Sequence, residues 1–144
     1  MRKIRGFTAL LFICAAAVAL FFALAVLPDR LAFDGGDKYT FYVGDTSKNC
    51  RVVTCPAGDA AITRLTLQKV CGESATFPSL DMQSFLESVN GEIIFTETLD
   101  DSVNYYCTAA LPYAVELYGK QINLHICVKS DSVTVGSPII FGGY

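Results

Sequence analysis

His125 and Cys127 are the two residues whose types and spacing point most directly to chemistry. His125 is the only histidine among the 144 residues, and Cys127 follows it two positions later. On a β-strand, such residues lie on the same face, so imidazole and thiol would be neighbours. The pair could supply two zinc ligands, or the base and nucleophile of a thiol enzyme. No further ligands stand at the spacing of a zinc site, so we expect neither a metal nor a cofactor.

Five cysteines follow the N-terminal hydrophobic run, and an odd number leaves at least one of them without an intramolecular partner. Cys50 and Cys55 are close in sequence, while Cys107 and Cys127 fall on segments expected to be neighbouring strands. These are the two candidate disulfide pairs in an exported protein. The fifth cysteine is Cys71, and the C-x-x-C spacing of thiol oxidoreductases is absent.

Other catalytic arrangements lack support in the sequence. A serine or cysteine triad could form only around His125, and no serine has the glycine context of a nucleophile elbow. The adjacent acids Asp100 and Asp101 favour a turn rather than a general acid and base pair. The sequence therefore favours a binding protein, with a thiol- or metal-dependent enzyme centred on His125 and Cys127 as the alternative.

Four tyrosines gather around the two hairpins predicted below. They are Tyr105, Tyr106, Tyr113 and Tyr118. Tyrosine buries a large area at little cost in side-chain entropy and carries a hydroxyl, so it is common in binding sites. We therefore regard these residues as the candidate binding residues, while recognising that they could instead fill the edge of the core.

The N-terminal residues 1–28 are expected to form a signal anchor or a signal peptide. Three cations precede residues 7–27, an apolar run long enough to cross a bilayer as a transmembrane helix. Basic residues beside the first hydrophobic segment stay on the cytoplasmic side, which places the remaining chain outside the membrane. This predicts a single-pass cell-membrane protein. The small residues before Ala25 also fit a cleavage site, and cleavage there would release the protein.

The rest of the chain is expected to comprise a juxtamembrane spacer at 29–38 and one extracytoplasmic domain at 39–144. Three of the 11 Lys and Arg residues precede the hydrophobic run, so eight remain against 14 acids, a formal charge of −6. The eight cations are scattered, whereas nucleic-acid binding requires clustered ones. We therefore expect no nucleic-acid partner.

The clearest helix is predicted over Pro78–Gly91. Ser79 is the expected N-cap, and Gly91 lies where helices often end. Four apolar side chains recur at helical spacing along this segment: Met82, Phe85, Leu86 and Val89. They form one stripe, so we expect this main helix to pack on a sheet.

Seven strands are indicated by β-branched and aromatic runs between turn-forming residues. They are Tyr39–Val43, Arg51–Thr54, Glu92–Thr98, Val103–Thr108, Tyr113–Tyr118, Gln121–Lys129 and Thr134–Phe141. Residues 57–70 fit a helix or a strand, and Gly72–Ser74 indicates a bend between strands. Gly119 and Lys120 are expected to form a type II′ hairpin turn. Pro138 has no N–H for a ladder, which favours an edge or a bulge.

The fold class predicted from these elements is α+β, with an antiparallel sheet packed by one main helix. In the strand Gln121–Lys129, apolar residues alternate with more polar ones that include His125 and Cys127. One face of the sheet should therefore meet the helix, and the other should be more polar and partly open. An open face is a natural place for a partner.

Three segments resemble the YwmB-like family of exported proteins from Gram-positive, often spore-forming bacteria. They are Val103–Cys107, Ile122–Ile126 and Val135–Ile140, followed by the terminal Tyr144. The resemblance covers about the last 40 to 50 residues and implies a TATA-binding-protein-like fold, of which this chain would hold one half. It carries no catalytic residues. We expect a membrane-anchored, non-catalytic domain that binds an unknown cell-envelope or spore-related protein through its open sheet face.

Overall fold

The computed structural model describes residues 12–21, 31–45 and 49–141. The chain divides into two compact units, Met1–Arg30 and Leu31–Tyr144. In the first unit, residues 12–21 form a solvent-exposed helix. The remainder of the predicted run 7–27, with the candidate cleavage site at Ala25, lies outside the described residues. Within the described part of the chain, no helix has both the length and the apolar character needed to cross a bilayer.

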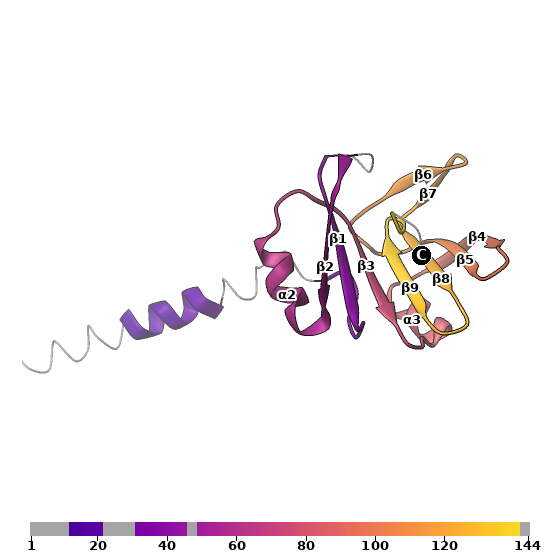
Figure 1. Cartoon of the computed structure of the whole chain (residues 1–144). Helices are drawn as coiled ribbons and strands as arrows, with labels where there is room; N and C mark the ends of the chain where they lie inside the picture. The colour runs from indigo at the N-terminus through magenta and orange to yellow at the C-terminus, as the bar shows by residue number, and fades with distance from the viewer. Residues whose placement is uncertain (1–11, 22–30, 46–48, 142–144) are drawn as a thin grey trace, which may run out of the picture. The chain divides into compact units, whose positions relative to one another are not determined.

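The second unit is an α+β domain built on a seven-stranded antiparallel sheet (Figure 1). The strand order is β2-β1-β3-β9-β8-β5-β4, and a two-stranded sheet, β6-β7, forms a separate arm. The elements are β1 Lys38–Val43, β2 Arg51–Pro56, α2 Ala57–Thr66, β3 Val70–Phe77, α3 Met82–Ser88, β4 Glu92–Thr98, β5 Val103–Thr108, β6 Val115–Leu117, β7 Lys120–Ile122, β8 Leu124–Val128 and β9 Val133–Ser137. The predicted fold class is thus confirmed at the level of an α+β domain with a large antiparallel sheet.

Helix α3 is shorter than predicted and has a different cap. Asp81, rather than Ser79, is the N-cap, because its carboxylate accepts hydrogen bonds from the N–H groups of Gln83 and Ser84. The Ser84 hydroxyl donates a third bond to Asp81 at 2.8 Å. The predicted apolar stripe is confirmed, since its four side chains pack against the buried core.

Most of the ambiguous region 57–70 forms helix α2, so the described part of the domain contains two helices where one main helix was predicted. The predicted bend at Gly72–Ser74 is wrong, because these residues lie inside strand β3. Gly72 is needed for packing: a Cβ there would lie 2.8 Å from the Phe141 ring and 3.0 Å from the Ser137 carbonyl oxygen. Gly72, which suggested a turn in the sequence, is therefore required by the close packing of Phe141 and Ser137 against β3.

The β6-β7 hairpin turns at Tyr118 and Gly119, where the predicted turn was Gly119-Lys120. Both turn residues have positive φ, at 51° and 72°, which is the type I′ pattern. The predicted strand Gln121–Lys129 is also interrupted, at Asn123. Its side-chain amide replaces a strand partner by donating to the carbonyl of Ala109 at 2.6 Å and accepting from the Ala109 N–H at 2.5 Å.

The last strand, β9, ends at Ser137, immediately before the cis peptide bond to Pro138. It lies between β3 and β8 in the centre of the sheet, so the expected edge or bulge position is wrong. A central strand is compatible with Pro138 because the strand ends before the residue that lacks an N–H.

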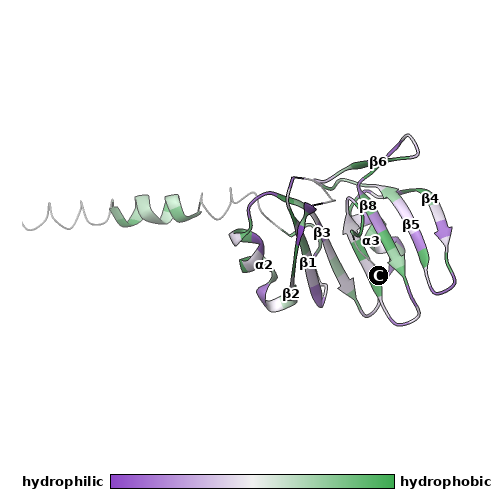
Figure 2. Ribbon diagram, turned by 45° about the horizontal axis from the view of Figure 1, so that its top comes forward, coloured by the Kyte–Doolittle hydropathy of each residue, from purple (hydrophilic) through white to green (hydrophobic). Residues whose placement is uncertain are grey.

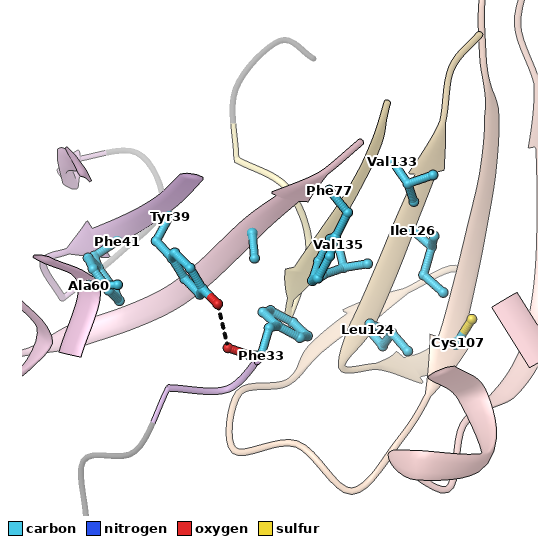
Figure 3. Close-up of a cluster of buried hydrophobic side chains, with 11 residues drawn as sticks. Phe33, Tyr39, Phe41, Ala60, Phe77, Cys107, Leu124, Ile126, Val133 and Val135 are labelled. Atoms are coloured by element: carbon cyan, nitrogen blue, oxygen red, sulfur yellow. Dashed lines mark hydrogen bonds between the residues drawn. The ribbon is translucent and has the colours of Figure 1, made fainter. Parts of the chain in front are cut away.

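The hydrophobic core lies on one face of the sheet, which we call the covered face (Figure 3). It includes the first residues of the second unit, which were predicted to be a spacer. Phe33 is only 2% exposed, and its ring centroid lies 6.2 Å from that of Phe85 in α3. The Tyr39 hydroxyl donates to the Phe33 carbonyl at 3.1 Å. Residues from Leu31 onward therefore belong to the folded domain.

The opposite face, which we call the open face, is crossed by the C-terminal segment 138–141. The Ile140 N–H donates to His125 on β8, and the Phe141 ring packs on Tyr42 of β1 at 5.0 Å. A Cβ at Gly136 would lie 2.8 Å from the Ile140 side chain, so glycine permits this crossing. Along β5, hydropathy changes repeatedly, as expected for a strand with two unlike faces (Figure 2).

Candidate functional site

An aromatic column stands on the open face of β4, β5 and β8. Phe95 is paired with Tyr106, and Tyr106 is paired with His125 in the strand register. The ring centroids are 4.4 and 4.5 Å apart, and the ring planes are inclined by 17° and 12°. Side chains directly opposite one another on antiparallel strands are about 5 Å apart, so the register itself brings these rings into stacking contact.

The β6-β7 hairpin adds a fourth ring, that of Tyr118. This side chain is 93% exposed, yet its centroid lies 5.8 Å from that of Phe95, with an interplanar angle of 73°. Tyr118 is also one of three non-glycine residues with positive φ among those described. A bulky side chain rarely adopts this conformation, and type I′ turns favour asparagine, aspartate or glycine at this position. The turn would be more stable with asparagine, aspartate or glycine at this position, so the stability of the turn does not explain why the residue is tyrosine.

These rings surround a hollow of about 460 Å³ on the open face. Besides the column and Tyr118, its walls include Leu117, Ile139 and Ile140, and Glu97 supplies a carboxylate. The Tyr106 hydroxyl donates to Glu97 at 3.3 Å. The volume is in the range of small-molecule sites, and an apolar lining with few polar groups is typical of them. We take this aromatic hollow as the candidate functional site.

His125 is held as a neutral ring within this site. The backbone N–H of Ile140 donates to Nδ1 at 3.3 Å, so the ring proton is on Nε2, which donates to Asn104 Oδ1 at 3.0 Å. The residue is 2% exposed, and burial lowers the pKa of His125 to about 4. Both ring nitrogens are engaged in hydrogen bonds within the domain.

Cys127 lies on the same face as His125, as the spacing predicted, but it is not arranged as a nucleophile. It is 1% exposed, and burial raises the pKa of its thiol. A buried protonated thiol is a poor nucleophile and a poor metal ligand. Among the described residues, no three His, Cys, Asp or Glu side chains are grouped so that they could hold a metal ion.

The structure does not bring the two candidate disulfide pairs together, and no disulfide links the cysteines of the described residues. Cys107 packs in the core on the covered face, whereas Cys127 lines the open face of the neighbouring strand. Cys50 and Cys55 are separated by the extended strand β2. At a rise of about 3.3 Å per residue, the four steps from Arg51 to Cys55 alone span on the order of 13 Å, so Cys50, one residue before the strand, lies beyond the roughly 7 Å between Cα atoms that a disulfide spans.

Of the four candidate tyrosines, the hollow contains Tyr106 and Tyr118 but not the other two. Tyr105 packs against the core on the covered face. The Tyr113 hydroxyl accepts a hydrogen bond from Arg64 Nη2 at 3.2 Å. The sequence did not identify Phe95 as a site residue, since the signal for it lies in strand register and not in local spacing.

Glu73 is a buried acid that the sequence also failed to identify. It is 1% exposed on the covered face, and Oε1 accepts a hydrogen bond from the Ala32 N–H at 2.9 Å. Burial raises the pKa of Glu73 to about 7, although the Ala32 N–H and the positive charge of Arg64 both oppose the shift. The side chain thus fixes the N-terminal residues of the domain to strand β3.

A second hollow, of about 590 Å³, lies on the open face over β1, β2, β3 and β9. Its lining is rich in hydroxyl groups, and several are already bonded to each other. Thr40 and Thr54 are 3.2 Å apart, and Thr76 and Thr134 are 3.4 Å apart, oxygen to oxygen. The segment 138–141 separates this hollow from the aromatic one, since Ile140 lines both.

Comparisons with known protein families, with curated proteins and with solved structures found no match to this chain. The functional argument therefore rests on the residues of the aromatic hollow.

Proposed function

We propose that this protein is a non-catalytic, membrane-anchored extracytoplasmic domain that binds another cell-envelope or spore-related component through its open sheet face. The aromatic hollow is the binding site. The observation that carries the proposal is Tyr118, a large and almost fully exposed ring at a turn position that disfavours it. Strain of this kind gathers at functional sites, where the side chain contributes to binding and not to folding.

The N-terminal sequence supports the location. A cationic start followed by the uncharged run 7–27 is typical of an export signal that keeps its N-terminus in the cytoplasm. The resemblance to the YwmB-like family also favours export. Retention as an anchor gives a cell-membrane protein, and cleavage near Ala25 gives a secreted one.

The state of the two chemistry-bearing residues supports a non-catalytic role. Both nitrogens of His125 are in hydrogen bonds, and the Cys127 thiol is buried with a raised pKa. A base and a nucleophile need access to a substrate and to each other. These two residues are better explained as parts of the scaffold that holds the aromatic hollow.

A cell-wall sedimentation assay tests the proposal. The full-length chain, purified in maltoside micelles, is mixed with isolated walls of a Gram-positive bacterium and centrifuged. We expect the chain to co-sediment, and we expect Tyr118→Ala to weaken binding by about tenfold or more, because exposed aromatic anchors dominate binding energy. The matched control is Ile62→Ala, which removes a side chain that is 68% exposed on α2. Equal binding by both variants and the unaltered chain would contradict the proposal.

A further inference from the structure

We propose that the aromatic hollow binds a quaternary ammonium group, such as that of choline, on the exposed face of the Tyr118 ring, with the carboxylate of Glu97 as the charged group of the same hollow. The inference rests on the proposed function, because it takes the open face as the binding face. It adds the chemical class of the ligand.

The charge of the lining favours a cation. Among the described residues that surround the hollow, Glu97 is the one formally charged side chain, and none of them is Lys or Arg. His125 adds no positive charge at neutral pH, since burial lowers its pKa to about 4. The hollow therefore presents a single negative charge among apolar walls, which attracts cations and repels anions.

The placement of the rings favours attraction between a cation and the π face of a ring. Within the column, the faces of Phe95, Tyr106 and His125 are stacked on one another and are largely occupied. The ring of Tyr118 is 93% exposed, so its face is accessible to a ligand. A cation within about 6 Å of an aromatic centroid is attracted by the negative face of the ring. Tyr118 offers such a face at the rim of the hollow.

The apolar walls distinguish a quaternary ammonium from a primary one. A primary ammonium brings three N–H donors that must find acceptors when it leaves water. The walls at Leu117, Ile139 and Ile140 offer no side-chain acceptor, which leaves few acceptors for such a group, chiefly the Thr96 hydroxyl and the Glu97 carboxylate, and the carboxylate already accepts from the Tyr106 hydroxyl. A quaternary ammonium has no N–H group and is weakly hydrated, so it loses little in such a site. The hollow should therefore bind a quaternary ammonium group more tightly than a primary one.

Calorimetric titration of the full-length chain in maltoside micelles tests the inference. The probes are tetramethylammonium, choline and 3,3-dimethyl-1-butanol, which is the uncharged analogue of choline. We expect both cations to bind at least about tenfold more tightly than the alcohol. Glu97→Gln should remove most of that difference. The matched control, Glu116→Gln, changes an exposed carboxylate on the β6-β7 hairpin, which carries Tyr118, but this carboxylate does not line the hollow, so the difference should stay intact.

Phosphatidylcholine vesicles and free choline distinguish the two sources of the group. Binding of both indicates that the headgroup is recognised in a lipid, whereas binding of free choline alone indicates a soluble or polymer-borne ligand. Equal affinity for choline and its uncharged analogue would overturn the inference, as would equal effects of Glu97→Gln and Glu116→Gln. If Tyr118→Ala abolishes binding to cell walls while no cation binds, the proposed function stands and the ligand class is wrong.

Discussion

Glu73 on the covered face and His125 on the open face are both buried ionisable side chains, and the two differ in chemical type and in what they hold. On the covered face, the acid Glu73 accepts the N–H of Ala32, near the N-terminal end of the domain. On the open face, the base His125 accepts the N–H of Ile140, near the C-terminal end. Burial shifts each pKa towards the neutral form, to about 7 for Glu73 and about 4 for His125. Each face thus fixes one end of the domain with a group whose neutral form is favoured by burial.

The two groups have opposite effects on stability as pH changes. The folded-state pKa of Glu73 is raised from 4.5 to about 7, so its contribution is complete below pH 4.5 and is lost as pH rises through 7. The folded-state pKa of His125 is lowered from 6.5 to about 4, so its contribution is complete above pH 6.5 and is lost as pH falls through 4. Between about pH 4.5 and 6.5, stability therefore falls with rising pH because of Glu73 and rises with it because of His125.

The largest expected effect on stability comes from removing a ring packed on the covered face, compared with removing an exposed ring on the open face. Phe41 on β1 is fully buried on the covered face, and Phe41→Ala should lower the free energy of unfolding by about 3 to 5 kcal/mol, because it leaves a cavity. Tyr118→Ala should change it by less than about 0.5 kcal/mol. Urea denaturation followed by circular dichroism measures both. A comparable loss for the two variants would show that the hairpin ring is structural.

Glu73→Gln tests the covered face. The substitution keeps the shape of the side chain and removes its titration, so the variant should gain stability relative to the unaltered chain between pH 4.5 and 7. Over this range, the difference in the free energy of unfolding between the variant and the unaltered chain should change by about 3 kcal/mol. Unfolding free energies at a series of pH values provide the measurement, with the exposed Glu87→Gln as a control. A pH-independent difference would mean that Glu73 titrates normally in the folded domain.

His125→Asn tests the open face, and the expected dependence has the opposite sign. Because the unaltered chain loses the contribution of His125 on acidification, the variant should gain relative stability as pH falls from 6.5 to 4. The difference again amounts to about 3 kcal/mol. The same unfolding series measures it. If the difference stayed constant over this range, the imidazole would not be held neutral, and its hydrogen bond from Ile140 would need another explanation.

Tyr118→Asn has the smallest expected effect on stability and is the sharpest test of the hairpin. An Asn-Gly pair is favoured in a type I′ turn, so the variant should be more stable by up to about 1 kcal/mol. Thermal unfolding checks the gain, and sedimentation with cell walls checks the loss of binding. A variant that is more stable and binds equally well would remove Tyr118 from the site.

Local patterns predicted the parts of the fold that depend on neighbouring residues. The apolar stripe of α3 requires only helical spacing within a few turns, and the strand β5 requires only alternation. Gly72–Ser74 misled the prediction, because Gly72 is required by Phe141, which is 69 positions away in the chain. The residue types of Gly72 and Phe141 can be read from the sequence, but the fact that the two segments pack closely together cannot.

The aromatic hollow was only half predictable for the same reason. Tyr106 and Tyr118 were identified because tyrosine is a common binding residue. Phe95 became part of the site through its register opposite Tyr106, and His125 became buried through a segment that folds back over it. The register of Phe95 opposite Tyr106 belongs to the β4-β5 hairpin, whereas the register of Tyr106 opposite His125 joins strands that are separated in the chain by β6 and β7. The second register depends on the whole sheet, so no local pattern contains it.

The position of β9 has a consequence for the order in which the domain can assemble. Strands β2, β1 and β3 form one half of the sheet and β8, β5 and β4 the other, and β9 is the only strand that pairs with both halves. It is also the last strand to be synthesised. Until Val133–Ser137 is available, β3 and β8 each present an unpaired edge, and such edges invite aggregation. Completion of the sheet must therefore await the synthesis of residues 133–137.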